Sequence, residues 1–208
     1  MKLYAITAAA RLPADQNGPE DALVSLAAQW AAGGVAFIQI REKTLSAGAL
    51  ERLAVRVMEA VRAARADTAV LINGRADVAL AVGADGVHLP GLSGMTAPFL
   101  RQLFAECRSR KPLVSVACHS IAEIEAARDE GADMALFAPV FGKLLGDGSV
   151  IPGVGLDALR RACEVAKPMP VYALGGITAE NAGACMAAGA AGIAAIRLFQ
   201  GADWMALK

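Results

Sequence analysis

The 208-residue sequence has no excess of charge of either sign, because 20 Lys and Arg residues balance 20 Asp and Glu residues. The charges are scattered along helix-like stretches such as ERLAVRVMEAVRAARAD and form no single block. Binding to nucleic acid or to an anionic membrane surface depends on a basic patch. We therefore expect neither nucleic acid nor a membrane as a main partner.

Long apolar runs and paired cysteines are also missing. No stretch reaches the roughly 18 apolar residues of a membrane span, and the N-terminal MKLYAIT has no signal-peptide pattern. The four cysteines, at positions 107, 118, 163 and 185, form no Cys-x-x-Cys pair, as is typical of free thiols in a reducing compartment. These absences predict a cytoplasmic protein.

The sequence does contain a regular alternation of short apolar segments with helix-like segments. The apolar segments, too hydrophobic for a half-solvated sheet, are KLYAIT, VAFIQI, AVLIN, DGVHL, LVSVA, MALFA, PVYALG and AGIAAI. The helix-like segments lie at residues 21–32, 47–65, 75–82, 97–108, 121–130, 156–166 and 179–188. This pattern predicts an α/β protein, a single (β/α)8 TIM barrel over residues 1–208, with an open flavodoxin-like sheet as the alternative. The aperiodic FGKLLGDGSVIPGVG is expected to be a mobile loop.

A phosphate site is indicated near the end of the chain. Reacting groups of such a barrel lie at the C-terminal ends of its strands. Gly175 and Gly176 stand there, before a helix that Thr178 is expected to cap, and glycines let backbone N–H groups approach a phosphate. Arg197 ends the next predicted strand. The alternative is that the two glycines serve only a tight turn.

A second polar group follows the second predicted strand. Gln39, Arg41 and Lys43 alternate in FIQIREKT, so an extended chain points them to one side. Two cations and an amide suit a diphosphate or a carboxylate. The alternative is that Arg41 pairs with Glu42 or Asp85 while Lys43 is only solvated.

The two histidines of the sequence both fall near strand ends. His119 follows a strand and precedes a predicted helix start at Ser120, so it is a candidate general acid or base, or else a loop hydrogen-bonding group. His88 is flanked by Val87 and Leu89 and is interpreted as a core or lining group. No set of His, Asp and Glu residues has metal-ligand spacing.

In order along the chain, the segments LYAIT, FIQIREKT, LINGRADVAL, GVHLP, VACHS, LFAPVF, VYALGGIT and AGIAAI resemble the thiamine phosphate synthase and TenI superfamily. The resemblance implies a (β/α)8 barrel that acts on thiazole phosphate in thiamine biosynthesis. Synthases of this superfamily hold Mg²⁺ with two aspartates, where this chain has Gly74 and Ser93. NGRAD and LPGLS are instead similar to TenI-type proteins, which isomerise a carboxythiazole phosphate to its aromatic tautomer.

The resemblance therefore favours a metal-independent thiazole tautomerase with no cofactor, in which His119 moves the proton. Its substrate-binding residues would be Gln39, Arg41, Lys43, Asn73 and Lys143, and its phosphate-binding residues Gly155, Gly175, Gly176, Ile196 and Arg197. One alternative is a Mg²⁺-dependent thiamine phosphate synthase, which would also bind a pyrimidine diphosphate. The other is a non-catalytic barrel that binds thiamine precursors. A homodimer is left open, because Trp30 and Trp204 suit either a core or an interface.

Overall fold

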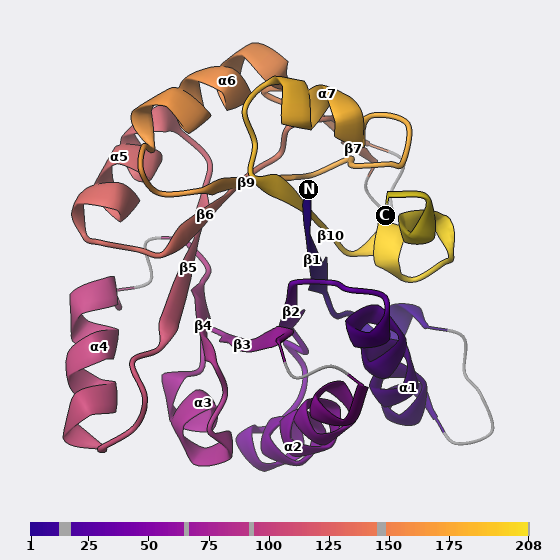
Figure 1. Cartoon of the computed structure of the whole chain (residues 1–208), viewed down its shortest axis with the longest axis vertical. Coiled ribbons are helices and arrows are strands. Elements are labelled where there is room, and N and C mark those ends of the chain that lie inside the picture. Colours follow the sequence, from indigo (N-terminus) through magenta and orange to yellow (C-terminus); the bar gives the residue numbers. More distant parts are fainter. Residues whose placement is uncertain (13–17, 65–66, 92–93, 145–148, 208) are drawn as a thin grey trace.

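Eight parallel strands close into a barrel in this computed structural model, which describes residues 1–12, 18–64, 67–91, 94–144 and 149–207 (Figure 1). The barrel strands are β1 (Lys2–Ile6), β2 (Phe37–Ile40), β3 (Ala69–Asn73), β4 (Gly86–Leu89), β5 (Leu113–Cys118), β6 (Met134–Phe137), β9 (Val171–Leu174) and β10 (Gly192–Ala195). They follow the order β1-β10-β9-β6-β5-β4-β3-β2, and β2 pairs again with β1. The predicted TIM barrel is confirmed, and the open sheet is excluded.

Helices surround this barrel on its outside (Figure 1). They are α1 (Pro19–Ala32), α2 (Ala47–Ala64), α3 (Ala76–Val82), α4 (Ala97–Glu106), α5 (Ile121–Asp129), α6 (Gly155–Val165) and α7 (Ala182–Ala187), with short 3-10 helices at Ala9–Arg11, Arg197–Phe199 and Asp203–Leu207. Within the described part of the chain, no helix combines the length and the apolar character needed to cross a membrane.

The aperiodic segment after β6 contains structure that the sequence analysis did not predict. β7 (Lys143–Leu144) and β8 (Val150–Ile151) form a small antiparallel pair, in which Lys143 lies opposite Ile151. Residues 145–148 lie outside the described part. The mobile loop expected here stays a prediction, and the sequence shows no sign of this pair because two-residue strands are too short to show a period.

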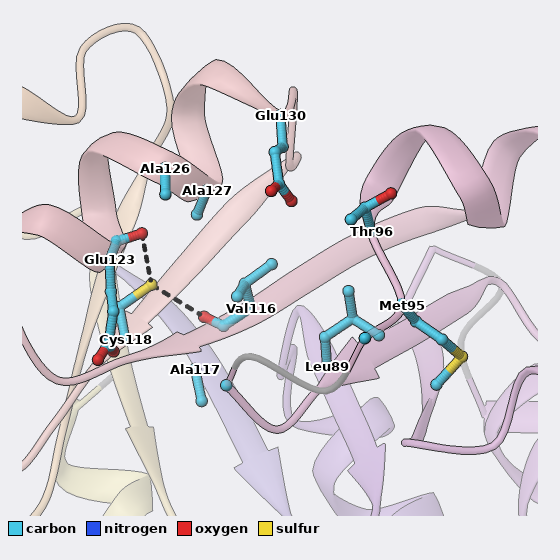
Figure 2. Close-up of a pocket in the computed structure, with 12 residues that line it drawn as sticks. Leu89, Met95, Thr96, Val116, Ala117, Cys118, Glu123, Ala126, Ala127 and Glu130 are labelled. Carbon is cyan, nitrogen blue, oxygen red and sulfur yellow. Dashed lines mark hydrogen bonds between the residues drawn. The ribbon is translucent and has the colours of Figure 1, made fainter.

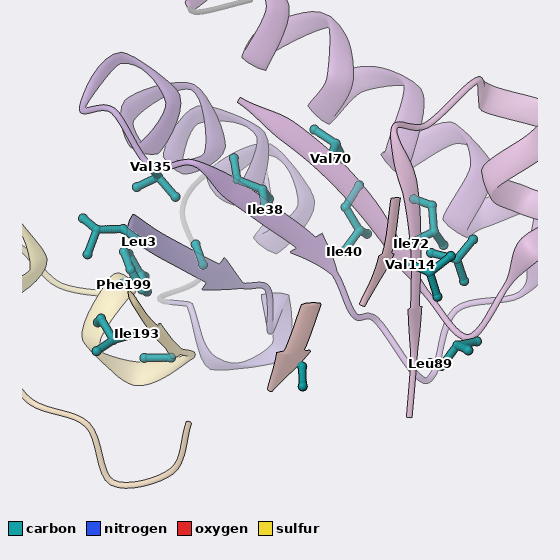
Figure 3. Packing of buried hydrophobic residues seen from close by; sticks show 14 of the residues in the cluster. Leu3, Val35, Ile38, Ile40, Val70, Ile72, Leu89, Val114, Ile193 and Phe199 are labelled. Carbon is teal, nitrogen blue, oxygen red and sulfur yellow. The ribbon is translucent and has the colours of Figure 1, made fainter. Parts of the chain in front are cut away.

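Two layers of core side chains hold the barrel. Alternate strand residues such as Ile38, Ile72 and Val114 point outward and pack against the helices (Figure 3). Inside the barrel, the rings of Tyr4 and Phe37 have centroids 5.6 Å apart. Both strand faces are therefore buried, which explains why the strands read as continuous apolar runs. The aromatic packing fills the barrel interior toward the N-terminal ends of the strands.

The two tryptophans belong to the core. Trp30 and Trp204 are each 1% exposed, and Trp30 Nε1 donates a hydrogen bond to the carbonyl of Phe199 at 2.9 Å. A Cβ on Gly33 would lie 2.2 Å from the Trp204 ring, so only glycine leaves room for it. The tryptophans thus close the C-terminal segment onto α1, and the prediction of a homodimer gains no support from them.

Aspartates hold neighbouring strands together at the N-terminal end of the barrel. Asp85 precedes β4, and its Oδ2 accepts a hydrogen bond from the Val70 backbone N–H at 2.8 Å. Asp133 precedes β6 and accepts from the Val114 N–H in the same way, also at 2.8 Å. The repeated Gly-Ala-Asp sequence before these strands therefore has a structural role, because each carboxylate satisfies a strand N–H.

Candidate active site

A cavity of about 580 Å³ opens at the C-terminal end of the barrel. Most of the predicted site residues line it: Gln39, Arg41, Lys43, Asn73, His119, Gly175, Gly176, Ile196 and Arg197. They come from segments at the ends of β2, β3, β5, β9 and β10, which meet there because parallel barrel strands all end on one side. The fold thus brings together residues as far apart in the chain as Gln39 and Arg197.

Two of the predicted site residues, Gly155 and Lys143, are not among the described residues that line this cavity. Gly155 is the first residue of α6, does not line the cavity, and its N–H already donates to the Val140 carbonyl at 3.0 Å. Lys143 lies in β7, and its side chain is outside the described part of the structure. The binding roles of Gly155 and Lys143 stay predictions.

The cations of the cavity are not bound by the acids considered for them. Thr7 Oγ1 donates to Glu42 Oε1 at 2.6 Å, and the Ala9 N–H donates to both oxygens of that carboxylate. Asp85 lies at the N-terminal end of the barrel, where Arg110 Nη2 donates to its Oδ1 at 2.7 Å. The interpretation that Arg41 pairs with Glu42 or Asp85 was therefore wrong, and Arg41 lines the cavity together with Lys43.

His119 is held with one ring nitrogen fixed. Its Nδ1 lies 2.8 Å from the Ala138 carbonyl oxygen, which only accepts, so Nδ1 carries a proton and donates it. In a neutral imidazole, Nε2 is then the basic nitrogen. The backbone holds this position too, because the His119 N–H donates to Glu123 Oε2 at 2.6 Å and Ser120 caps α5 through the Glu123 N–H. His119 therefore presents a positioned base at the cavity.

The Gly175-Gly176 turn requires glycine at both positions. Their φ angles are +98° and +65°, and an added Cβ would lie 2.7 Å from Pro139 or from the Gly142 carbonyl. The N–H groups of Gly176 and Ile177 have no acceptor in the described part of the chain. The turn therefore presents backbone donors to the cavity, a usual arrangement for binding an anion.

Two local predictions near this turn need correction. Thr178 does not cap a helix: α7 begins at Ala182, and the Thr178 N–H instead donates to Asn181 Oδ1 at 2.9 Å in a turn before it. Arg197 does not end a strand, because β10 ends at Ala195 and Arg197 begins a 3-10 helix. Both errors arise where polar residues form short turns that interrupt the strand and helix periods.

His88 also lines the cavity, as one of the two alternatives considered for it predicted. It is 5% exposed, and its Nδ1 lies 3.0 Å from Ser115 Oγ on the neighbouring strand β5. Burial, reinforced by the nearby Arg41 charge, lowers the pKa of His88 to about 3. His88 is therefore a neutral imidazole at physiological pH.

The described residues do not offer Mg²⁺ a set of protein ligands. No Asp or Glu side chain lines the cavity within the described chain, and no group of three His, Cys, Asp or Glu residues there has metal-binding geometry. Gly74 stands at the end of β3 with a φ of +65°, and Ser93 lies outside the described residues. Because Mg²⁺ requires carboxylate or phosphate oxygens, the described donors do not fit it.

A second cavity, of about 240 Å³, lies outside the barrel against α5 (Figure 2). Cys118 lines it, and its thiol lies 3.6 Å from the Glu123 carbonyl oxygen. Burial raises the pKa of the Cys118 thiol to about 12, so it stays protonated and is a poor nucleophile. All four cysteines are free, which confirms that they form no disulfide.

Comparison with known proteins identifies the family. A family model described as thiamine monophosphate synthase matches residues 3–199. A putative thiamine-phosphate synthase from Geobacter sulfurreducens is 42% identical over 165 residues, which cover 79% of this chain and 73% of that protein. A thiamine-phosphate synthase from Chloroflexus aurantiacus is 36% identical over 171 residues, which cover 82% and 74%.

A solved structure is similar to this chain and supports the same family. Thiamine phosphate pyrophosphorylase from Pyrococcus furiosus superposes with a TM-score of 0.78 at 27% identity, over 98% of this chain and 90% of that one. These names refer to the synthase, so they support the synthase alternative better than the tautomerase that the sequence analysis favoured. The chain belongs to the thiamine monophosphate synthase and TenI family and is an enzyme of thiamine biosynthesis.

Proposed function

We propose that the protein is a metal-independent thiazole tautomerase, which converts a non-aromatic carboxythiazole phosphate to its aromatic isomer. The observation that carries this proposal is the fixed imidazole of His119 at a cavity that no described carboxylate lines. A tautomerase needs one positioned acid–base group and no metal. This donor set suits such a reaction better than one that depends on Mg²⁺.

The proposed reaction is a proton shift within the thiazole ring. His119 Nε2 takes a proton from one ring position, and the electrons of the broken bond move into the ring double bonds. The imidazolium then returns a proton at a second ring position, so His119 is restored and the product is an isomer. The Nδ1–H bond to the Ala138 carbonyl keeps the ring oriented in both steps and stabilises the imidazolium.

The proposed binding mode places the substrate across the cavity. The phosphate would accept hydrogen bonds from the backbone N–H groups of the Gly175-Gly176 turn, which lies on the β9 and β10 side of the cavity. Arg197 lines the cavity on the same side. The ring and its carboxylate would face Arg41, Lys43 and Asn73, on the β2 and β3 side. In the barrel order, β9 stands opposite β3, so the two groups lie on opposite sides of the cavity.

A second candidate function is thiamine phosphate synthase, and the names of the relatives favour it. Arg41 and Lys43, which face the same cavity, suit the diphosphate of a pyrimidine substrate. This reaction would join the carbon that carries the diphosphate of the pyrimidine substrate to the thiazole nitrogen. The bond from that carbon to the diphosphate would break and release pyrophosphate.

Two assays on purified protein separate these functions. We expect ultraviolet absorbance to show faster conversion of the carboxythiazole phosphate tautomer, unchanged by EDTA. Absence of this acceleration, together with Mg²⁺-dependent release of pyrophosphate from pyrimidine diphosphate and thiazole phosphate, would replace the tautomerase with the synthase. Saturable binding of thiazole phosphate without either reaction would instead support the binding barrel.

A further inference from the structure

The backbone of His119 lies between two regular elements and belongs to neither. β5 ends at Cys118, which pairs with Phe137 of β6, and α5 begins only at Ile121. Neither the strand ladder nor the helix therefore supplies an acceptor for the His119 backbone N–H. The acceptor has to come from a side chain or from water.

Glu123 supplies this acceptor through a capping arrangement at the start of α5. Its Oε2 accepts from the His119 N–H at 2.6 Å, and Ser120 Oγ accepts from the Glu123 N–H at 3.2 Å. In the usual capping box, a glutamate at the third helical position accepts the N–H of the capping residue itself, which here is Ser120. The Glu123 carboxylate reaches one residue further back, and that residue is the candidate base.

Ala138, which follows β6, holds the same region from the other side. Its N–H donates to the Cys118 carbonyl at 3.0 Å, and its carbonyl accepts from His119 Nδ1 at 2.8 Å. The peptide group between Cys118 and His119 is therefore hydrogen-bonded at both its C=O and its N–H. Of these three bonds, only the bond to Glu123 depends on a side chain other than that of His119. Substitution of Glu123 thus loosens the base without changing it.

We infer that Glu123 is a positioning residue for the proton transfer: its carboxylate fixes the His119 backbone, so that Nδ1 stays on the Ala138 carbonyl and Nε2 stays aimed at the substrate. Glu123 is not among the described residues that line the active-site cavity; it lines the outer cavity beside Cys118 (Figure 2). It therefore acts on the reaction only through His119. The kinetic tests of this inference rest on the proposed function, whereas the spectroscopic test does not.

Tautomerisation kinetics separate positioning from binding. Glu123→Ala should lower kcat about tenfold and leave KM nearly unchanged, because a displaced base slows the chemical step while the phosphate is bound elsewhere. Glu123→Gln keeps an oxygen that accepts the His119 N–H and should restore most of kcat. The matched control Thr96→Ala removes the cap of α4, where Thr96 Oγ1 accepts the Phe99 N–H at 3.3 Å, and should change neither constant. An unchanged kcat in Glu123→Ala, or an equal loss in Glu123→Gln, would overturn the inference.

A double variant shows whether Glu123 acts through His119. In the His119→Ala background, Glu123→Ala should not lower the remaining rate any further, because the group that it positions is absent. A further tenfold fall in this background would show that Glu123 acts on the reaction by another route, and it would overturn the inference.

Nuclear magnetic resonance of 15N-histidine-labelled protein tests the same contact without substrate. The sequence has two histidines, so His119→Ala assigns both signals. At about pH 8.5, where an ordinary histidine is neutral, we expect long-range 1H–15N correlations to show His119 protonated at Nδ1. Glu123→Ala should move both ring nitrogens toward the average of the two tautomers, whereas Thr96→Ala should not.

Ring-nitrogen shifts of His119 that are the same in Glu123→Ala and in the wild type would overturn the inference. The expected shifts in a protein without tautomerase activity would instead disprove the proposed function alone, because the contact between Glu123 and His119 would then be established for another reaction or for binding.

Discussion

The two ends of the barrel use charge in opposite ways. At the N-terminal end, the carboxylates of Asp85 and Asp133 accept backbone N–H groups and pair with arginines. At the C-terminal end, Arg41, Lys43 and His119 line a cavity to which no described Asp or Glu contributes. A net charge of zero thus hides a separation, in which acids at one end hold strands together and cations at the other end line a cavity. We expect substitutions at the two ends to separate stability from binding.

Two glycines with positive φ, one at each end of the barrel, should differ in how much stability an added Cβ costs. Gly176→Ala places a Cβ 2.7 Å from the Gly142 carbonyl, so we expect the unfolding free energy to fall by about 3 kcal/mol. Gly34→Ala, with a φ of +86° and open space around its Cβ, should cost only about 1 kcal/mol. Urea unfolding measures both values. Equal losses would show that the turn is not closely packed.

Acid should destabilise the cavity end through His88. Its pKa is lowered to about 3 from an ordinary value of 6.5, so the unfolded chain binds this proton first as the pH falls. The stability contribution is complete above pH 6.5 and is lost as the pH falls toward 3, at about 1.4 kcal/mol per pH unit. Urea unfolding between pH 6.5 and 4 should show a shallower pH dependence for His88→Gln than for the wild type. Identical slopes for His88→Gln and wild type would contradict the assignment.

At the opposite end, Asp133→Ala should lower stability without changing binding. The substitution removes the acceptor of the Val114 N–H and the partner of Arg101, so we expect the unfolding free energy to fall by about 2 kcal/mol. The control Asp129→Ala removes an exposed carboxylate beside Arg128 and should leave the unfolding free energy nearly unchanged. Thermal unfolding and calorimetric titration with thiazole phosphate measure the two properties. Weaker binding by Asp133→Ala would break the proposed separation of the two ends.

Arg41→Gln is expected to have the smallest free-energy effect, and only on binding. Removing one cavity cation should weaken carboxythiazole phosphate binding about tenfold and reduce its salt dependence. Arg56→Gln is the matched control, because Arg56 is exposed and paired with Asp21 on the outer helices. Calorimetry at two salt concentrations measures both variants. Equal affinity and salt dependence for Arg41→Gln and wild type would remove Arg41 from the binding site.

The barrel could be predicted from the sequence because strands buried on both faces leave apolar runs and amphipathic helices leave a period. The same reasoning located His119 and the Gly175-Gly176 turn, since strand ends mark the mouth of a barrel. It missed the hydrogen bond between His88 and Ser115, which depends on the cross-strand register that sets the two residues side by side. The start of α7 was also missed, because hydrogen bonds between Thr178 and Asn181 form a turn that competes with the helix.

The most direct test of the central claim is the rate of carboxythiazole phosphate tautomerisation by wild type and His119→Ala, in EDTA, beside the unfolding free energy of each. His119 is exposed, so we expect the variant to keep its stability within about 0.5 kcal/mol. Its rate should fall about a hundredfold or more, because the positioned base is lost. An unchanged rate in a folded variant would contradict the account that this end of the barrel moves a proton through His119.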